Sequence, residues 1–450
     1  MKKLTEIKVF GLLEQYTYKV KLVSDSSITM IFAPNGTGKT KLLQLINSVF
    51  KNDYLALFEL PFEVVEFKFH DNDFLKVSKV VNDKDSEVKD YLTYDIVNNS
   101  SSDCFKVQFI KDIPNLTTIS RRLPFLRRIN KKEWYDFNNK RKLQLNDIME
   151  EYEEIFNVSF NVDEEKRDLI KNFISVHLIE TNRLHDIRSY NSNRHNSFIN
   201  DRYEELEFDT VNSLSDAIRV LISNKLNEFA SVSQELDRTF PSRLVSRMKL
   251  NENTINVNYI MDKLERLENY RQKLSRIGLL DSQSETFQGF SENPDMYIAN
   301  VLELYIEDTE KKLSVFNDLE KRITLFIKII NERYNDKQLE IDKNEGFIIK
   351  LRNGRKLKNI NQLSSGEQHT LVMFFNLLFE SEPNTLVLID EPEISLHIEW
   401  QQSFLEDIKL ISELTRVEFI VATHSPDIMN GNFELCVGLE DLGEKNDEES

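Results

Sequence analysis

The chain has 450 residues, of which 40% are hydrophobic and 30% are charged, and its net charge is −18. This length predicts two or three structural units with a large apolar core. The negative charge excludes a surface that grips nucleic acid over its whole extent, so any such contact needs a local basic patch. The two cysteines form no motif and no stretch is apolar enough to span a membrane, so we expect a cytoplasmic protein without membrane contact.

The N-terminal region predicts an antiparallel sheet beside a main α/β layer. Its short apolar or alternating segments have the period of strands, and turn residues such as Asn72-Asp73 separate them. The predicted strands are Leu4–Val9, Tyr16–Leu22, Ile28–Phe32, Phe62–Phe69, Phe74–Val81 and Tyr91–Ile96.

A phosphate-binding loop follows the third of these strands. Residues 32–40 read Phe-Ala-Pro-Asn-Gly-Thr-Gly-Lys-Thr and lead into apolar residues at helical spacing. Glycines let backbone N–H groups turn toward a phosphate, Lys39 can reach its oxygens, and the Thr40 hydroxyl can ligate Mg²⁺. Ala33 stands where the first glycine is expected. We therefore predict that ATP and Mg²⁺ bind at Asn35, Gly36, Thr37, Gly38, Lys39 and Thr40.

One stretch, residues 121–143, is locally basic, with Trp134 and Tyr135 among its lysines and arginines. Such a patch can contact the phosphates of nucleic acid. It can equally be a solvated face or a dock for an acidic partner, and the sequence leaves these readings open.

From about residue 201 to residue 334 the pattern is helical. Apolar residues from Ile298 to Ile330 predict one long helix, and those from Ile260 to Leu274 predict another. Phe240-Pro241 is expected to break an earlier helix. We expect these helices to pack antiparallel.

Two carboxylates follow a buried strand near the C-terminus. Leu386–Ile389 is wholly apolar and runs into Asp390 and Glu391. Asp390 is predicted to hold the metal, and Glu391 to act as general base toward the attacking water. Alone, such a pair is weak evidence for a nucleotide site, because buried strands often end in acids. It is strong evidence in a chain that also contains a phosphate-binding loop.

Two further motifs flank this strand. Residues 363–368 place Ser364 and Gly366 at the start of an apolar helix, which is an anion-binding device or an ordinary helix cap. His424 follows a second apolar strand, Phe419–Thr423, where a histidine that senses the γ-phosphate is expected.

The order of these four motifs resembles that of the ABC-type ATPases, in particular the soluble RecF/SMC/OLD-like group of AAA family ATPases. Residues 366–369, 389–397 and 233–244 look similar to segments of the ATPase subunits of the bacterial anti-phage systems Septu and PARIS. The resemblance covers most of the chain and is weakest over residues 98–175.

The resemblance implies an α/β fold: an ABC-type ATPase head with an antiparallel β subdomain and an inserted helical domain. The expected domains are residues 1–184 and 336–440 for the head, 185–335 for a short coiled-coil-like insertion, and 441–450 for an acidic tail. In this family the heads form a head-to-tail dimer, in which Ser364 and Gly366 contact the phosphate bound by the other subunit. Asn182 lies near the position of the Q-loop glutamine.

The resemblance also implies a function: an ATP-driven switch and scaffold in anti-phage defence. With no HNH pattern and no paired-metal cluster in the chain, cutting would need a separate effector nuclease, and DNA or a phage protein would be the trigger. The dimer could build a larger assembly such as a hexamer. A DNA-repair or DNA-end-binding ATPase of the RecF/SMC type is the main alternative. A transporter ATPase and a nucleotide-binding scaffold without turnover are the others.

Overall fold

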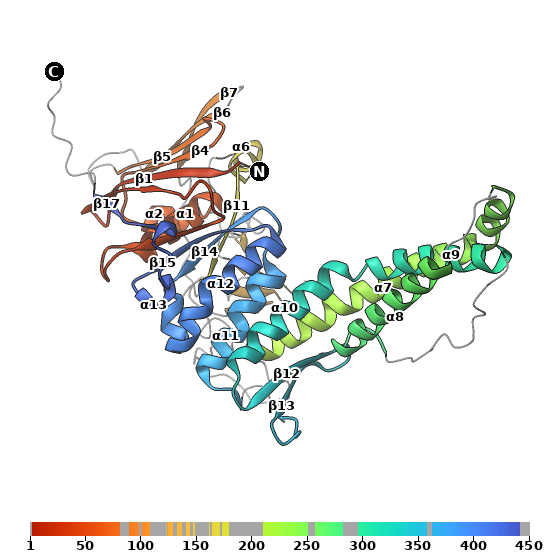
Figure 1. Ribbon diagram of the computed structural model, residues 1–450. Helices are drawn as coiled ribbons and strands as arrows, with labels where there is room; N and C mark the ends of the chain where they lie inside the picture. The colour runs from red at the N-terminus through yellow and green to blue at the C-terminus, as the bar shows by residue number, and fades with distance from the viewer. Residues whose placement is uncertain are drawn as a thin grey trace. The chain divides into compact units, whose positions relative to one another are not determined.

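The computed structural model describes residues 2–81, 90–98, 101–108, 123, 125–128, 133–136, 141–144, 147–148, 162, 164–171, 173–179, 210–250, 257–281, 296–357 and 362–441. The chain forms two compact units (Figure 1). The first comprises residues 1–210 and 365–450, and the second comprises residues 211–364.

A parallel sheet forms the centre of the first unit. Its three central strands are buried almost throughout, as is usual for parallel sheets, and its two outer strands are partly buried. In spatial order they are β11 (Ser175–Ile179), β14 (Thr385–Asp390), β15 (Glu418–Thr423), β3 (Ile28–Phe32) and β16 (Cys436–Val437).

The register of this sheet brings three strand ends together. Thr423 of β15 pairs with Phe32 of β3, and Asp390 of β14 pairs with Ala422. The segments that follow β3, β14 and β15 therefore leave the sheet on the same side, at the carboxyl ends of the strands. Ligands of open α/β sheets bind at these carboxyl ends.

A second, antiparallel sheet belongs to the same unit, as expected from the alternating N-terminal segments. Its order is β17 (Glu440–Asp441), β2 (Tyr16–Lys21), β1 (Leu4–Leu12), β4 (Val64–Phe69), β5 (Phe74–Val80), β6 (Tyr91–Asn98) and β7 (Ser101–Gln108). A separate three-stranded sheet contains β8 (Leu126–Arg128), β9 (Glu133–Asp136) and β10 (Arg141–Gln144).

Helix α1 (Lys39–Phe50) joins the two larger sheets in one core. Leu42, Leu43 and Ile46 are fully buried in the same cluster as residues of β1, β4 and β14. The Phe50 ring meets Phe67 of β4 edge-on, with 4.9 Å between the ring centroids. The helix that begins at the phosphate loop is thus held on both sides.

Further helices complete this unit, and Figure 1 shows α11 and α12 on the other side of β14 and β15 from α1. The elements are α2 (Tyr54–Glu59), α6 (Glu164–Lys171), α11 (Ser365–Phe375), the π-helical turn η2 (Asn376–Glu380), the 3₁₀ turns η3 (Pro392–Ser395) and η4 (Phe433–Leu435), α12 (Ile398–Thr415) and α13 (Pro426–Met429).

The second unit is mainly helical. It contains α7 (Thr210–Leu250), α8 (Val257–Arg276), α9 (Met296–Ser314), α10 (Asn317–Arg333), β12 (Lys337–Asp342) and β13 (Gly346–Leu351). The pairs Arg243–Asp308 and Lys312–Asp237 show that α7 and α9 are antiparallel, as expected. The pairs Lys263–Glu310 and Lys273–Glu320 show that α8 runs parallel to α9 and α10, so the expected antiparallel packing is wrong for these helices.

The β12–β13 hairpin belongs to the helical unit, although the sequence analysis assigned residues 336–364 to the ATPase head. The backbone N–H of Phe347 donates to Ser215 Oγ of α7 at 2.9 Å. Asn331 of α10 exchanges two hydrogen bonds with the backbone of Leu339. These contacts attach the hairpin to α7 and α10. The periodicity of its strands does not reveal which unit the hairpin packs on.

Two local predictions in the helical unit are wrong. Helix α7 continues through Pro241, and Thr239 Oγ1 and Arg243 both donate to the carbonyl of Leu236 in the turn before the proline. The predicted single helix from Ile298 to Ile330 is two helices, interrupted at Phe316, whose ring is fully buried.

The predicted fold class is confirmed: an α/β unit with an antiparallel sheet, and an inserted helical unit. Among the described residues, no helix is both long enough and apolar enough to cross a membrane.

Candidate nucleotide site

The loop between β3 and α1 has the backbone of a phosphate-binding loop. Gly36 and Gly38 have φ angles of +85° and +81°, which residues with a Cβ rarely adopt. A Cβ on Gly38 would also stand 3.4 Å from Leu13 Cδ1. Two hydrogen bonds shape the loop: Tyr16 Oη donates to Gly36 O at 3.1 Å, and Thr37 Oγ1 donates to Pro34 O at 2.9 Å.

Lys39 lies folded over this loop and is 4% exposed. Its Nζ donates to the carbonyls of Ala33 at 2.6 Å and Pro34 at 2.9 Å. Burial of an ammonium is costly unless acceptors surround it, and these two carbonyls supply them. Phosphate oxygens are stronger acceptors for the same group because they are charged.

Thr40, at the start of α1, meets Asp390, the last residue of β14. Thr40 Oγ1 donates to Asp390 Oδ2 at 2.8 Å, and Asp390 is 2% exposed. A hydroxyl and a carboxylate side by side suit Mg²⁺, which takes one or two protein oxygens together with substrate phosphates and waters. This donor set fits the predicted metal. No cluster of three or more His, Cys, Asp or Glu ligands occurs in the described part of the chain.

Glu391 adopts a strained backbone directly after Asp390. Its φ is 40° and its ψ is 60°, the left-handed region, which costs a residue with a side chain about 1–3 kcal/mol. Its N–H donates to Ala422 O of β15 at 2.9 Å, which holds the turn against the neighbouring strand. The Glu391 side chain is 20% exposed, so its carboxylate remains accessible at the edge of the sheet.

His424 follows β15 and lies beside two carboxylates. Its Nδ1 is 3.9 Å from Glu391 Oε1 and 3.0 Å from Glu393 Oε1. Sequence reasoning named Glu391 and His424 but did not assign Glu393. In the sequence, Glu393 differs from other acidic residues only in lying two positions after Glu391. Its burial against His424, which distinguishes it, is visible only in the structure.

The structure therefore brings together the residues of the phosphate loop, Asp390, Glu391 and His424. Gly366 lies in the first turn of α11, and its carbonyl accepts a bond from Thr370 Oγ1 at 2.8 Å. Ser364 is the last residue of the helical unit and is exposed. The roles of these two residues toward a partner subunit stay predictions.

Two other predicted features, the Q-loop position and the basic stretch, lie wholly or partly outside the described residues. Asn182 lies outside the described residues, as do most of the basic residues in the stretch 121–143. Within that stretch Trp134 is fully buried, so its ring is a core group rather than a surface for stacking bases. Arg127 and Lys142 are exposed.

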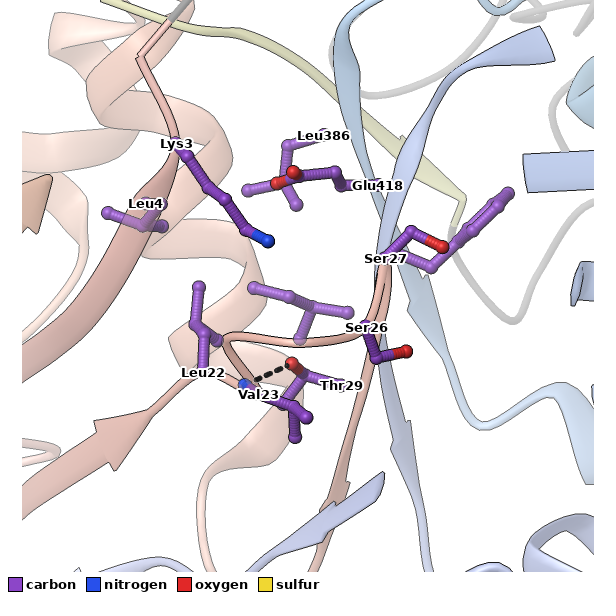
Figure 2. A pocket seen from close by; sticks show the side chains of 11 residues that line it. Lys3, Leu4, Leu22, Val23, Ser26, Ser27, Thr29, Leu386 and Glu418 are labelled. Atoms are coloured by element: carbon purple, nitrogen blue, oxygen red, sulfur yellow. Dashed lines mark hydrogen bonds between the residues drawn. The ribbon is translucent and has the colours of Figure 1, made fainter. Parts of the chain in front are cut away.

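A small cavity at the opposite end of the parallel sheet is not part of this site. It lies at the starts of β3, β14 and β15, and Figure 2 shows Lys3 and Glu418 among its lining residues. Its volume is about 10 Å³, roughly that of one water molecule. Burial raises the pKa of Glu418, and Lys3 opposes this shift. The cavity is too small for a nucleotide.

The sequence matches the family described as the AAA ATPase domain over residues 1–429. The chain therefore belongs to this family of ATPases. The phosphate loop and the Asp390-Glu391 pair agree with this assignment.

Individual relatives are more distant. Protein ea59 of Escherichia phage lambda is 30% identical over 130 residues, which are 28% of this chain and 24% of that protein. The chain thus matches about a quarter of that relative's length.

Solved Smc head domains also match. The Pyrococcus furiosus domain, bound to the C-terminal domain of ScpA, is 14% identical, with 98% of this chain and 94% of that chain covered and a TM-score of 0.37. The Thermotoga maritima domain is 12% identical, with 97% and 94% covered and a TM-score of 0.31. Family membership rests on the domain match alone.

Proposed function

We propose that the chain binds and hydrolyses ATP with Mg²⁺ at the carboxyl ends of β3, β14 and β15. ATP would switch a head-to-tail dimer of these subunits, and the dimer would hold and control a separate effector nuclease in bacterial anti-phage defence.

The contact between Thr40 Oγ1 and Asp390 Oδ2 carries the ATPase part of this proposal. The two residues are 350 positions apart in the chain, yet their oxygens lie 2.8 Å from each other. One belongs to the phosphate loop and the other ends a buried strand. Their meeting supports the proposed Mg²⁺ site, because such a pair belongs beside a loop that would hold the phosphates.

Each residue then has a role in hydrolysis. Bound ATP would supply the γ-phosphoryl group, which passes to water as ADP leaves, and bound Mg²⁺ would neutralise the charge that develops on it. Lys39 exchanges its bonds to Ala33 O and Pro34 O for phosphate oxygens. Glu391 accepts the proton of the attacking water as general base. His424 contacts the γ-phosphate and reports its presence.

The dimer and the defence role rest on sequence resemblance. Ser364 and Gly366 form a signature-like helix start, which in similar ATPases completes the site of the other subunit. The segments 366–369, 389–397 and 233–244 resemble anti-phage ATPases. A related segment occurs in a phage protein, ea59, which is consistent with a role at the interface between phage and host.

ATP turnover and molecular mass test the first part of the proposal. Purified wild-type protein is compared with Glu391→Gln by phosphate release and by size-exclusion chromatography with mass analysis in MgATP. We expect the wild type to turn over ATP and the variant to accumulate as a nucleotide-bound dimer or larger assembly. Glu399→Gln is the matched control, since Glu399 is exposed in the first turn of α12 and should behave as wild type. Equal inactivity of both proteins with no change in mass contradicts the proposal.

The stalled variant then tests the defence role. Glu391→Gln is co-expressed with the product of the neighbouring open reading frame and purified in MgATP. Co-purification of a nuclease whose cutting depends on ATP supports the proposal. Strong stimulation of turnover by DNA ends, without a bound nuclease, supports the DNA-repair alternative instead.

A further inference from the structure

Glu393 is a buried carboxylate next to the proposed catalytic groups. It lies in η3 and is 7% exposed. Its Oε1 accepts hydrogen bonds at 2.8 Å from the hydroxyl of Thr423 and from the backbone N–H of His424. The imidazole Nδ1 of His424 is 3.0 Å from the same oxygen. A single carboxylate oxygen thus faces three groups of Thr423, the last residue of β15, and of His424, which follows it.

The surroundings of Glu393 contain no permanent cation among the described residues. Its recorded ion pair is with His424, and its Oε2 has no hydrogen-bond partner in the described part of the chain. A buried carboxylate is costly unless its oxygens are satisfied. The contacts of Oε1 are with Thr423 and His424, so an effect of this carboxylate falls first on the neighbouring histidine.

A second set of contacts fixes the distance between η3 and the His424 segment. Gln401 Nε2 donates to the carbonyls of Glu393 and Leu396 at 3.3 and 3.0 Å. Gln401 Oε1 accepts from Ser425 Oγ at 2.7 Å. The two turns are therefore tied together through α12, and the carboxylate of Glu393 is held at the imidazole.

We propose that Glu393 is a positioning residue for His424, and this rests on the proposed ATPase function. Glu393 accepts the Nδ1–H, which fixes the orientation of the ring, and donation from Nε2 to a phosphate oxygen then requires a proton on that nitrogen as well. It also keeps Nδ1 from Glu391, which lies 3.9 Å from that nitrogen. Glu391 thereby stays available as general base. In the present geometry Nδ1 is close to Glu393 but not aligned for a hydrogen bond, so the proposed Nδ1–H bond requires a rotation of the ring.

Kinetics in two backgrounds test this role. Glu393→Gln keeps the size of the side chain and removes its charge. We expect it to lower kcat for ATP by about 10- to 100-fold, as when a carboxylate that orients a histidine is lost, with KM changed by less than about threefold. In a His424→Ala background the same substitution should have no further effect. An equal loss in both backgrounds shows a purely structural role and overturns the proposal.

A spectroscopic measurement separates this inference from the ATPase assignment. The ¹⁵N resonances of His424 are recorded in full-length wild type, Glu393→Gln, Glu393→Asp and Thr423→Val, with His424→Ala used for assignment. We expect the Nδ1–H tautomer in wild type and in Thr423→Val, and a shift toward mixed tautomers in both Glu393 variants. The Asp variant covers the case in which the Gln variant fails to fold. If the tautomers are unchanged in the Glu393 variants, the inference is overturned even if ATP is hydrolysed. If the tautomers change but the protein does not turn over ATP, the contact between Glu393 and His424 stands and the proposed function is refuted.

Discussion

Thr40 and Asp390 form a 2.8 Å hydrogen bond between the start of α1 and the end of β14. Both residues are positioned by elements of the same core, since α1 packs on the antiparallel sheet and on β14 at once. The position of this proposed metal-binding pair therefore depends on packing in the core of the unit.

Thr40→Val should impair magnesium-dependent turnover. The substitution keeps the shape of the side chain but removes the hydroxyl, so the metal loses one protein ligand. We expect kcat to fall by about 100-fold and the Mg²⁺ concentration for half-maximal activity to rise. Activity is measured across a magnesium titration. Thr40→Ser retains the hydroxyl and should remain within about tenfold of wild type; if it is as impaired as Thr40→Val, metal ligation is not the role of this residue.

Arg243→Met should destabilise the helical unit. Arg243 makes a bidentate pair with Asp308 at 2.6 and 2.7 Å and also donates to Leu236 O beside Pro241. The hydrogen bonds to Asp308 raise the pKa of the guanidinium. Because Asp308 is only 4% exposed, it would be left buried without its partner, at a cost of about 3–5 kcal/mol.

Urea denaturation followed by circular dichroism measures this cost. The control is Arg266→Met, whose i,i+4 pair with Asp262 is exposed and should contribute about 0.5 kcal/mol or less. The double substitution Arg243→Met with Asp308→Leu should recover much of the loss. If it recovers none, the buried charge is not the cause.

Gly278→Ala should also destabilise the helical unit, for a different reason. Gly278 has a φ of +78°, and a Cβ there would lie 1.9 Å from the carbonyl oxygen of Ile341. Both the backbone conformation and the overlap oppose any side chain, so we expect a loss of about 2–4 kcal/mol in unfolding free energy. Gly354→Ala is the matched control, because its φ is +76° but no atom lies within 4 Å of the added Cβ. It should cost about 1 kcal/mol, and equal losses would exclude the overlap as a cause.

His177 predicts a pH dependence of stability. Burial, with a smaller contribution from Lys51, lowers the pKa of His177 to about 4 in the folded chain. The unfolded chain, with a histidine pKa of about 6.5, binds this proton more readily, so protons favour unfolding. The stability is complete above about pH 6.5, falls as the pH drops toward 4, and loses roughly 3 kcal/mol from this group.

Urea midpoints at several pH values between 4 and 8 check this prediction. His177→Gln removes the titrating group and should give a flatter profile over the same window, whereas the exposed His70 offers a control in His70→Gln. Profiles of equal slope for wild type and His177→Gln would contradict it.

Much of the nucleotide site could be predicted from sequence because its chemistry is local. The phosphate loop is a run of consecutive residues between a strand and a helix, and the Asp390-Glu391 pair ends an apolar segment that only a buried strand explains. The antiparallel sheet was also predictable, since alternation of apolar and polar residues is a property of each strand by itself.

Other features depend on partners far away in the chain, and periodicity carries no information about those. Helix α7 continues through Pro241, and the β12–β13 hairpin joins the helical unit through Ser215. Glu393 reads as one more acid after Glu391 until its carboxylate is found buried against His424. The sequence by itself determined which groups are candidates for the chemistry. Tertiary structure decided which of them meet, because burial and hydrogen bonding between distant residues arise only when the chain is folded.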